Sequence, residues 1–354
     1  MLRIGYIFGT IAVLAMGCSN STSTIVPESS VSSLDSLVIK TDTIVISNTI
    51  VRIDTVLKVD TALQYDTVPY YLTDTVYVPT SNSYAIPNVP RAYTDTVNIV
   101  FFGNSLLRGY STFGMSASDP SQDYYYKVNA ALRSNGIYTN SIKVPTGNFE
   151  SILDSVAQNE LLEEYLYPKI SKETDYVFLQ IGDNVNTNAL VDNWDDAMSR
   201  LINGVQAKSS SKTKIYAVAT WYTTDYTNRA RAIIERRANL DGIGFIDISQ
   251  YNTEENRAYI GQVVYRPTLN TYHITYDSYT EVACTLTITF TVLARQVTVS
   301  ITPDSWEVDE ENKVITWTGH EYIVTNPGIA SHPGDKGFTA IAGAIVEAVM
   351  SDYE

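Results

Sequence analysis

Three short polar motifs carry side chains that could act together on a carbonyl compound. Ser105 follows the apolar segment 99–102, Asn184 follows the strand-like segment 176–181, and His332 precedes the last apolar segment, 337–349. A serine becomes a nucleophile when a base such as histidine takes its proton, and the oxyanion that forms needs hydrogen-bond donors. Alone, each residue has an ordinary interpretation as a helix cap, a turn residue or a surface histidine. Nucleophilic chemistry therefore requires a fold that brings the three together.

In chain order, these motifs resemble the sequence blocks of the SGNH (GDSL-like) hydrolase family, whose name lists its Ser, Gly, Asn and His. The matching segments are Gly103-Asn104-Ser105-Leu106, Pro145-Thr146-Gly147-Asn148-Phe149-Glu150, Gly182-Asp183-Asn184 and His332-Pro333-Gly334-Asp335. The resemblance covers about residues 96–250 and 326–349. No Gly-x-Ser-x-Gly elbow surrounds Ser105, which argues against an α/β-hydrolase.

The resemblance implies a role for each of four residues. Ser105 would be the nucleophile and His332 the base. The oxyanion hole would consist of the N–H groups of Ser105 and Gly147 and the side-chain amide of Asn184. The family needs no metal or organic cofactor, and we expect none here. A serine esterase acting through an acyl-enzyme is the implied function.

The sequence departs from the family pattern at two positions. Asn104 stands where the family has Asp, and Ile329 stands three residues before His332, where the family has its acid. Three other carboxylates could be displaced third members of the site: Asp335, Glu321 and Asp247. For Asp335 we expect a role at the start of the last helix instead. The remaining alternative is a Ser-His dyad whose imidazole is oriented by a backbone carbonyl.

Strands alternating with amphipathic helices must position these residues, which predicts an α/β fold. We expect a three-layer α/β/α sandwich with a mostly parallel five-stranded sheet, of the SGNH or flavodoxin type. The predicted strands are Val97–Phe102, Tyr138–Val144, Tyr176–Ile181, Lys214–Thr220 and Gly244–Ile248. The predicted helices are Tyr124–Ser134, Phe149–Tyr167, Val191–Val205, Asn228–Leu240 and Gly337–Val349.

The α/β pattern is interrupted between Gln262 and Thr325 by strand-like segments. They are Tyr272–Tyr276, Thr285–Leu293, Gln296–Ile301 and Lys313–Trp317. An antiparallel β-subdomain inserted at 262–325 is the simplest interpretation. His273 and His320 lie in or beside it without partners at metal-ligand spacing, so we expect structural roles and no metal site.

The N-terminus has the features of an export signal. A short positive start, an apolar run of eleven residues from Ile4 to Leu14 and Ala15-Met16-Gly17-Cys18 predict a lipoprotein signal peptide over 1–17. Cys18 would carry the lipid, placing the protein in the bacterial cell envelope, at the outer membrane or cell surface. Residues 18–93 repeat Asp-Thr units and predict an extended stalk; paired strands are the alternative. The hydrolase domain would then span 94–354.

Composition excludes one class of partner. Lys and Arg number 24 against 39 Asp and Glu, a net charge of −15, and no basic cluster is present to bind nucleic acid. The expected partners are the membrane, through the lipid anchor, and an acylated small molecule or polysaccharide. An exported chain with 26 Tyr residues suggests acetylated or otherwise acylated polysaccharide. The rival hypothesis is an inactive hydrolase scaffold that binds carbohydrate or serves in adhesion at the surface.

Overall fold

The computed structural model describes residues 43–46, 49–52, 96–109, 112–146 and 148–351. Its largest sheet has five parallel strands in the order β4-β3-β5-β6-β7. These strands are β3 (Thr96–Gly103), β4 (Tyr138–Pro145), β5 (Tyr176–Gln180), β6 (Lys214–Val218) and β7 (Gly244–Ile246). The predicted α/β fold is confirmed. Since the chain moves from β3 to β4 and then to β5 on the other side of β3, the order reverses beside β3, where such sheets place their sites.

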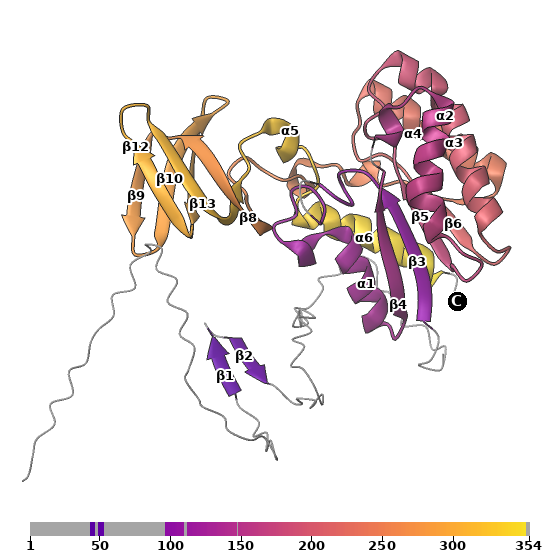
Figure 1. Ribbon diagram of the computed structural model, residues 1–354, viewed down its shortest axis with the longest axis horizontal. Coiled ribbons are helices and arrows are strands. Elements are labelled where there is room, and N and C mark those ends of the chain that lie inside the picture. Colours follow the sequence, from indigo (N-terminus) through magenta and orange to yellow (C-terminus); the bar gives the residue numbers. More distant parts are fainter. Residues whose placement is uncertain (1–42, 47–48, 53–95, 110–111, 147, 352–354) are drawn as a thin grey trace, which may run out of the picture. The chain divides into compact units, whose positions relative to one another are not determined.

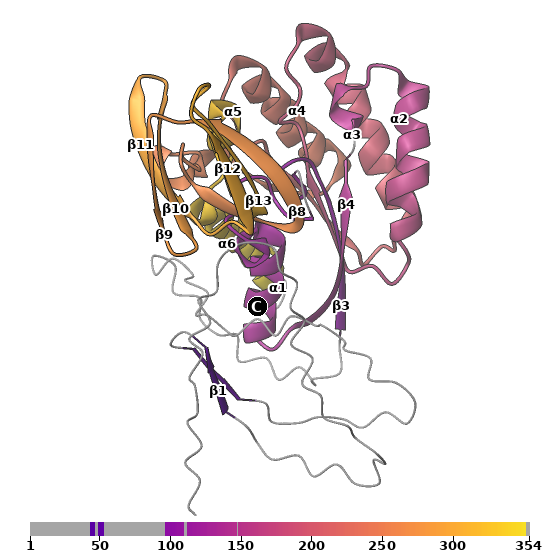
Figure 2. The same ribbon diagram turned by 60° about the vertical axis from the view of Figure 1, so that its left-hand side comes forward.

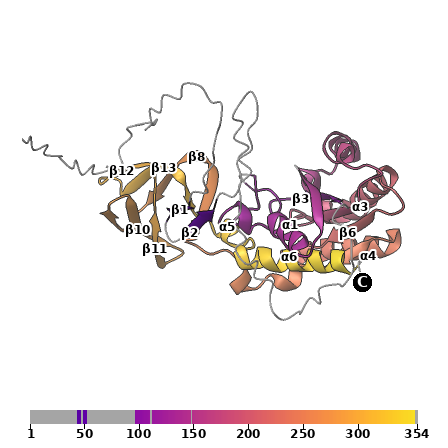
Figure 3. The same cartoon turned by 90° about the horizontal axis from the view of Figure 1, so that it is seen from below.

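Helices cover both faces of the sheet. The helices α1 (Tyr124–Ser134) and α6 (Asp335–Met350) pack against one face, and α2 (Ser155–Leu161), α3 (Asn188–Lys208) and α4 (Asp225–Asp241) belong to the other. Figure 2 shows α1 and α6 on one side of β3 and β4, with α2 and α3 on the opposite side. In Figure 3 the yellow α6 runs beside α1. The shorter helical segments are η1 (Pro120–Gln122), η2 (Phe149–Ser151), η3 (Leu162–Leu166), η4 (Tyr167–Lys169), η5 (Ser249–Tyr251), η6 (Glu254–Asn256) and α5 (Pro327–Ala330).

Alternation along β3 explains why the α/β unit has two cores, one on each face of its sheet. Ile99 and Phe101 point into the core formed with α1 and α6, whereas Val100 and Phe102 point into the core formed with α3 and α4. Successive side chains of a strand face opposite sides, so an apolar run without alternation is what a doubly covered strand requires. β3 is therefore fixed on both faces, and its carboxyl end is a rigid support for Ser105.

The segment predicted as one helix, Phe149–Tyr167, is broken. After η2 the chain leaves helical geometry, and the Asp154 carboxylate accepts the N–H groups of Val156 and Ala157 to start α2. A side chain that caps backbone N–H groups favours a new helix start over a continuous helix. Glu150, just before this break, is buried at the end of the sheet rather than exposed on a helix.

The predicted inserted β-subdomain is confirmed as two antiparallel sheets of three strands, in the orders β11-β10-β9 and β12-β13-β8 (Figure 1). Their strands are β8 (Val263–Thr275), β9 (Ser278–Val282), β10 (Thr285–Val292), β11 (Arg295–Ile301), β12 (Ser305–Asp309) and β13 (Val314–Ile323). The sheets share a hydrophobic core of their own. β9 and β12 were not predicted, because their solvent-facing residues weaken the apolar alternation.

The base of the insert is joined to the α/β unit. Val264 and Val324 are fully buried in the core that contains α1 and α6. The Gln262 amide donates to the carbonyl of Ser116 at 2.6 Å, on the loop that follows Ser105. The range 262–325 thus includes residues that support the sheet as well as residues of the separate β core.

Within the N-terminal part of the chain, β1 (Thr43–Ile46) and β2 (Thr49–Arg52) form an antiparallel pair. This agrees locally with the paired-strand alternative for the stalk. The signal peptide, Cys18 and the remainder of the stalk lie outside the described residues. Among the helices that are described, none has the length and apolarity needed to cross a membrane.

Candidate active site

Ser105 and His332 lie within hydrogen-bonding distance although they are far apart in the sequence. Ser105 occupies the turn after β3, and His332 lies between α5 and α6. The Oγ of Ser105 is 3.1 Å from Nε2 of His332. This is the separation that proton transfer from a serine to a histidine requires.

The hydrogen-bond partners of the other ring nitrogen, Nδ1, determine which nitrogen of His332 carries the proton. The Nδ1 atom is 2.9 Å from the carbonyl oxygen of Gly328 and 2.9 Å from the hydroxyl of Tyr222. A carbonyl can only accept a hydrogen bond, so Nδ1 must carry the hydrogen in the neutral ring. Nε2 then presents its lone pair to the hydroxyl of Ser105. The imidazole is therefore in the tautomer that a general base needs.

The His332 side chain is partly buried. Burial lowers the pKa of His332 below its ordinary value of 6.5, while the Gly328 and Ile329 carbonyls act in the opposite direction. The Tyr222 ring stands edge-on to the imidazole, with centroids 5.6 Å apart and an interplanar angle of 89°. Burial also raises the pKa of the Tyr222 phenol, so its hydroxyl is neutral.

The position where the family has its acid is part of the core here. The Ile329 side chain is buried with α6, and its carbonyl accepts the hydroxyl of Ser116 at 3.0 Å. No carboxylate could occupy that place without losing this apolar packing, because an isolated buried charge is costly.

The three alternative carboxylates make their hydrogen bonds elsewhere. Both oxygens of Asp335 bind Ser118, accepting its N–H at 2.9 Å and its hydroxyl at 2.6 Å. Asp247 accepts the N–H of Ser249 at 2.9 Å, and Glu321 in β13 accepts the N–H of Thr302. In the described part of the chain, the residues within hydrogen-bonding distance of Nδ1 are thus Gly328 and Tyr222.

Asn184 lies beyond the end of β5, next to β3 in the sheet, with its side chain exposed to solvent. Its Nδ2 donates to Oε2 of Glu150 at 2.6 Å. Gly182 precedes it at a φ of +109°, a conformation that favours glycine, and donates its N–H to Oε1 of Glu150. The carboxylate of Glu150 therefore binds both ends of the Gly182-Asp183-Asn184 turn.

Asn104, immediately before Ser105, is bound to two carboxylates. Its Nδ2 lies 3.3 Å from Oε1 of Glu150 and 3.1 Å from Oδ2 of Asp183, and its Oδ1 accepts the N–H of Leu106. An aspartate here would bring a third carboxylate against the other two, so the amide is the side chain that this environment accepts. The departure from the family at this position is thereby explained.

Glu150 and Asp183 are buried acids, exposed by 1% and 7%. Burial, and secondly the charge of Asp183, raises the pKa of Glu150 to about 7. Burial also raises the pKa of Asp183, against four hydrogen-bond donors that lower it. Two of those donors are the N–H groups of Trp221 and Tyr222, at 2.7 and 3.1 Å. Asp183 thus connects the Tyr222 loop with the Asn104 turn.

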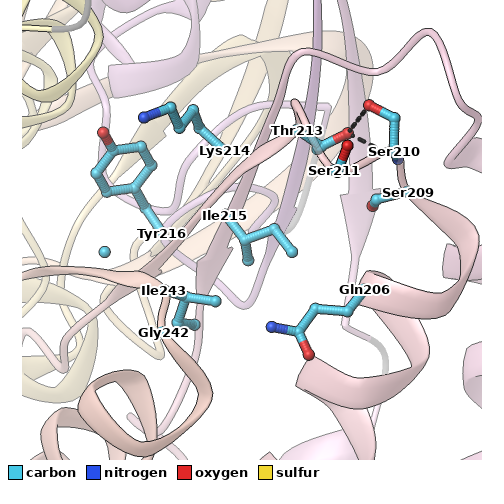
Figure 4. A pocket seen from close by; sticks show the side chains of 11 residues that line it. Gln206, Ser209, Ser210, Ser211, Thr213, Lys214, Ile215, Tyr216, Gly242 and Ile243 are labelled. Carbon is cyan, nitrogen blue, oxygen red and sulfur yellow. Dashed lines mark hydrogen bonds between the residues drawn. The ribbon is translucent and has the colours of Figure 1, made fainter.

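Gly147, the last residue expected in the oxyanion hole, lies outside the described residues. The cavity shown in Figure 4, of about 620 Å³, is a different place. It is lined by the C-terminal end of α3, the end of α4 and the first residues of β6, including Ser210, Thr213 and Lys214. In a parallel sheet this is the end opposite to Ser105, so the cavity is not part of the candidate active site.

The histidines of the insert have structural partners. Nδ1 of His273 lies 2.9 Å from the hydroxyl of Thr316, and Nδ1 of His320 lies 2.8 Å from the carbonyl of Arg266. In the part of the chain that the structure describes, no three His, Cys, Asp or Glu residues are grouped as metal ligands would be.

Sequence reasoning did not identify Glu150, Gly328 or Tyr222 as parts of this site. Gly328 contributes a backbone carbonyl, which leaves no mark on residue type. Asn104 was the available signal for Glu150, because an amide in place of an acid suggests that another acid lies nearby.

Comparison with known proteins gives matches among solved structures alone. No family model and no curated protein matches the chain. A candidate GDSL-like lipase from Parabacteroides merdae is 11% identical with a TM-score of 0.33, covering 44% of this chain and 79% of its own. A candidate lipolytic protein of the G-D-S-L family from Desulfitobacterium hafniense is 12% identical with a TM-score of 0.30, covering 45% and 81%.

A mutant of the esterase AlinE4 is 18% identical with a TM-score of 0.30, covering 43% of this chain and 75% of its own. Likenesses at this level do not assign chemistry, which depends on the side chains around Ser105.

Proposed function

We propose that this protein is an SGNH-type serine esterase that acts through a Ser105–His332 dyad. The observation that carries the proposal is the 3.1 Å contact between Ser105 Oγ and His332 Nε2, with Nδ1 held by the Gly328 carbonyl. Together these three residues supply a nucleophile, a base in the correct tautomer and a group that orients the base. An activated serine needs this arrangement.

In the acylation step, Ser105 Oγ forms a bond to the ester carbonyl carbon while its proton passes to Nε2 of His332. The carbonyl electrons move to the oxygen, which becomes the oxyanion. The ester C–O bond then breaks, and the leaving alkoxide takes the proton from Nε2. In deacylation, the oxygen of a water molecule forms a bond to the acyl carbon while a water proton passes to Nε2 of His332. The bond between that carbon and Ser105 Oγ then breaks, Oγ takes the proton from Nε2, and the carboxylic acid is released.

The oxyanion would be held by the N–H of Ser105 and one N–H of the Asn184 amide, with Gly147 as a further donor. During both steps His332 is transiently an imidazolium ion. Its Nδ1–H then donates to Gly328, and the Tyr222 hydroxyl lies at the same distance. Neutral oxygen dipoles, rather than a carboxylate, would therefore stabilise the positive ring.

For the substrate we propose an acyl group carried on a polysaccharide, with the enzyme attached to the envelope through a lipid on Cys18. The exposed ring of Tyr265 on β8 supports this choice, because its residue also donates its N–H to Ser118 on the loop after Ser105, at 2.7 Å. An exposed tyrosine of the insert is therefore attached directly to the loop that follows Ser105. Aromatic side chains with one wet edge suit such recognition surfaces.

Labelling with a fluorophosphonate tests the esterase proposal, since the probe reacts with an activated serine. Wild type should be labelled and should hydrolyse a small activated ester. Ser105→Ala and His332→Ala should each reduce hydrolysis by about 10³-fold or more, and the double variant should be hardly slower, because members of one catalytic unit are strongly non-additive. If Ser105→Ala hydrolyses at the wild-type rate, the esterase proposal is wrong and the carbohydrate-binding alternative replaces it.

A further inference from the structure

The buried acid Glu150 takes no part in the proton transfers above, yet it contacts both halves of the site. One oxygen accepts Nδ2 of Asn184 at 2.6 Å, and the other accepts the N–H of Gly182 and Nδ2 of Asn104. Asn104 is the neighbour of the nucleophile, and Asn184 is the proposed oxyanion donor. All three contacts come from donors, so the carboxylate acts only as an acceptor.

We propose, on the basis of the esterase function, that Glu150 is a positioning residue: its carboxylate fixes the Asn184 amide so that an N–H of Nδ2 is available to the substrate oxyanion. An amide group can bind in two flipped orientations that exchange Nδ2 and Oδ1. Against a carboxylate only the orientation with Nδ2 inward makes a hydrogen bond. The second hydrogen of that nitrogen remains for the ligand.

Protonation of Glu150 removes this selection. A proton on Oε2 needs an acceptor, and turning the Asn184 amide would supply its Oδ1. In the turned amide, Oδ1 of Asn184 would face Glu150. Nδ2 would then no longer lie where the oxyanion needs its donor. The rate of ester hydrolysis should therefore depend on the fraction of Glu150 that is ionised.

The groups that face Glu150 are few. They are the amides of Asn104 and Asn184, the N–H of Gly182 and the carboxylate of Asp183, which is the one ionisable group acting on Glu150 within the described part of the chain. Asp183 and burial both favour the neutral acid, whereas the three donors favour the carboxylate. Ionisation of this residue thus falls close to neutral pH instead of near 4.5.

Glu150→Gln is a sharp test because it changes little else. A glutamine Oε1 can still accept from Gly182 and Asn104, while its Nε2 would face Nδ2 of Asn184 and force that amide to turn. We expect kcat for a small ester to fall by about 10²-fold, the scale of a misplaced catalytic group, with KM changed by less than about threefold. Glu160→Gln, an exposed glutamate on α2, is the matched control and should leave both constants unchanged.

A double-variant comparison separates positioning from a merely structural role. Asn184→Ala should lower kcat by about 10²-fold to 10³-fold. If Glu150 acts through Asn184, adding Glu150→Gln should lower it by no more than about threefold further. Losses that multiply, with both proteins folded by circular dichroism, would overturn the inference while leaving the esterase proposal intact. Wild-type activity in Ser105→Ala would instead contradict the proposed function.

The pH dependence of kcat in the wild-type enzyme supplies a test that does not depend on a variant being folded. In wild type, kcat should rise with pH through about 7 as Glu150 ionises. In Glu150→Gln the remaining rise belongs to His332 and should lie below pH 6.5, since burial lowers its pKa. A wild-type kcat that is flat between about pH 6 and 8 would contradict the role of Glu150.

Discussion

At Nδ1 of His332, a carbonyl dipole stands where a carboxylate would place a full negative charge. A dipole orients the ring as well as a carboxylate does, but it stabilises the imidazolium less. This agrees with the direction of the His332 pKa, which burial lowers below 6.5. As the proposed base, His332 would be weaker than the histidine of a complete triad, and its ring would remain neutral at lower pH.

Removal of each alternative acid is therefore expected to have a small effect. Asp335→Asn, Glu321→Gln and Asp247→Asn should each leave the rate within about tenfold of wild type, whereas loss of a true triad Asp costs about 10⁴-fold. Tyr222→Phe should slow the reaction by several-fold, since it removes a hydroxyl 2.9 Å from Nδ1. Steady-state kinetics would measure the rate of each variant, and circular dichroism would show whether the variant is folded. A large loss in one folded acid variant would identify a displaced third member.

The pKa of Glu150 predicts how stability changes with pH. The folded protein holds this proton up to about pH 7, whereas the unfolded chain releases it near 4.5. Because the folded state then binds more protons, the free energy of unfolding should fall as pH rises from 4.5 to 7, by at most about 3 kcal/mol. Glu150→Gln should remove this slope, which denaturant titrations at several pH values would measure. An equal slope in the variant would contradict the assignment to Glu150.

Ser105, Asn184 and His332 could be chosen from the sequence because each follows or precedes a clear element. Glu150 could not, since its burial depends on contacts with Asn104 and Asn184, 46 and 34 residues away. The periodicity of the region also suggested a helix with Glu150 on it. The sequence pattern therefore did not indicate that Glu150 is a buried acid.

At the scale of elements, the parallel sheet and its covering helices followed from strand-like segments that alternate with amphipathic helices. The break at Asp154 did not, because a residue that caps a helix competes with helix propensity only when the tertiary structure holds the preceding segment. Asn104, Gly182 and Asn184 hold that segment through Glu150. The strands β9 and β12 have mixed exposure, which periodicity alone does not separate from loops.

Shortening the insert tests whether its outer part shapes substrate access. Residues 267–319 would be replaced by Asn-Gly, a two-residue turn, joining Arg266 to His320, which already contact each other across β8 and β13. The retained Val264 and Val324 keep the α/β core closed. Hydrolysis of a small ester should remain within about tenfold, while that of an acylated polysaccharide should fall further. An unfolded product would show that the outer part belongs to the core.

At the scale of the whole molecule, the proposed attachment to the membrane would depend on Cys18, which lies outside the described part of the chain. Cys18→Ala should move the protein from the membrane fraction to the soluble fraction, because a lipid on Cys18 is the expected anchor. Fractionation, together with mass spectrometry of the mature N-terminus, measures this. Membrane retention by a variant without lipid would contradict the lipoprotein hypothesis.

The hydrogen bond between Ser105 and His332 spans 227 positions of sequence. The first strand of the sheet carries the nucleophile, and the base precedes the last helix, whose Phe338 stacks on Tyr124 of α1. Contacts of such long range form late in folding, after the intervening loops have closed. A growing chain consequently lacks the dyad until nearly the whole domain has been synthesised and α6 has docked. The proposed ester hydrolysis would therefore begin only after the domain has folded.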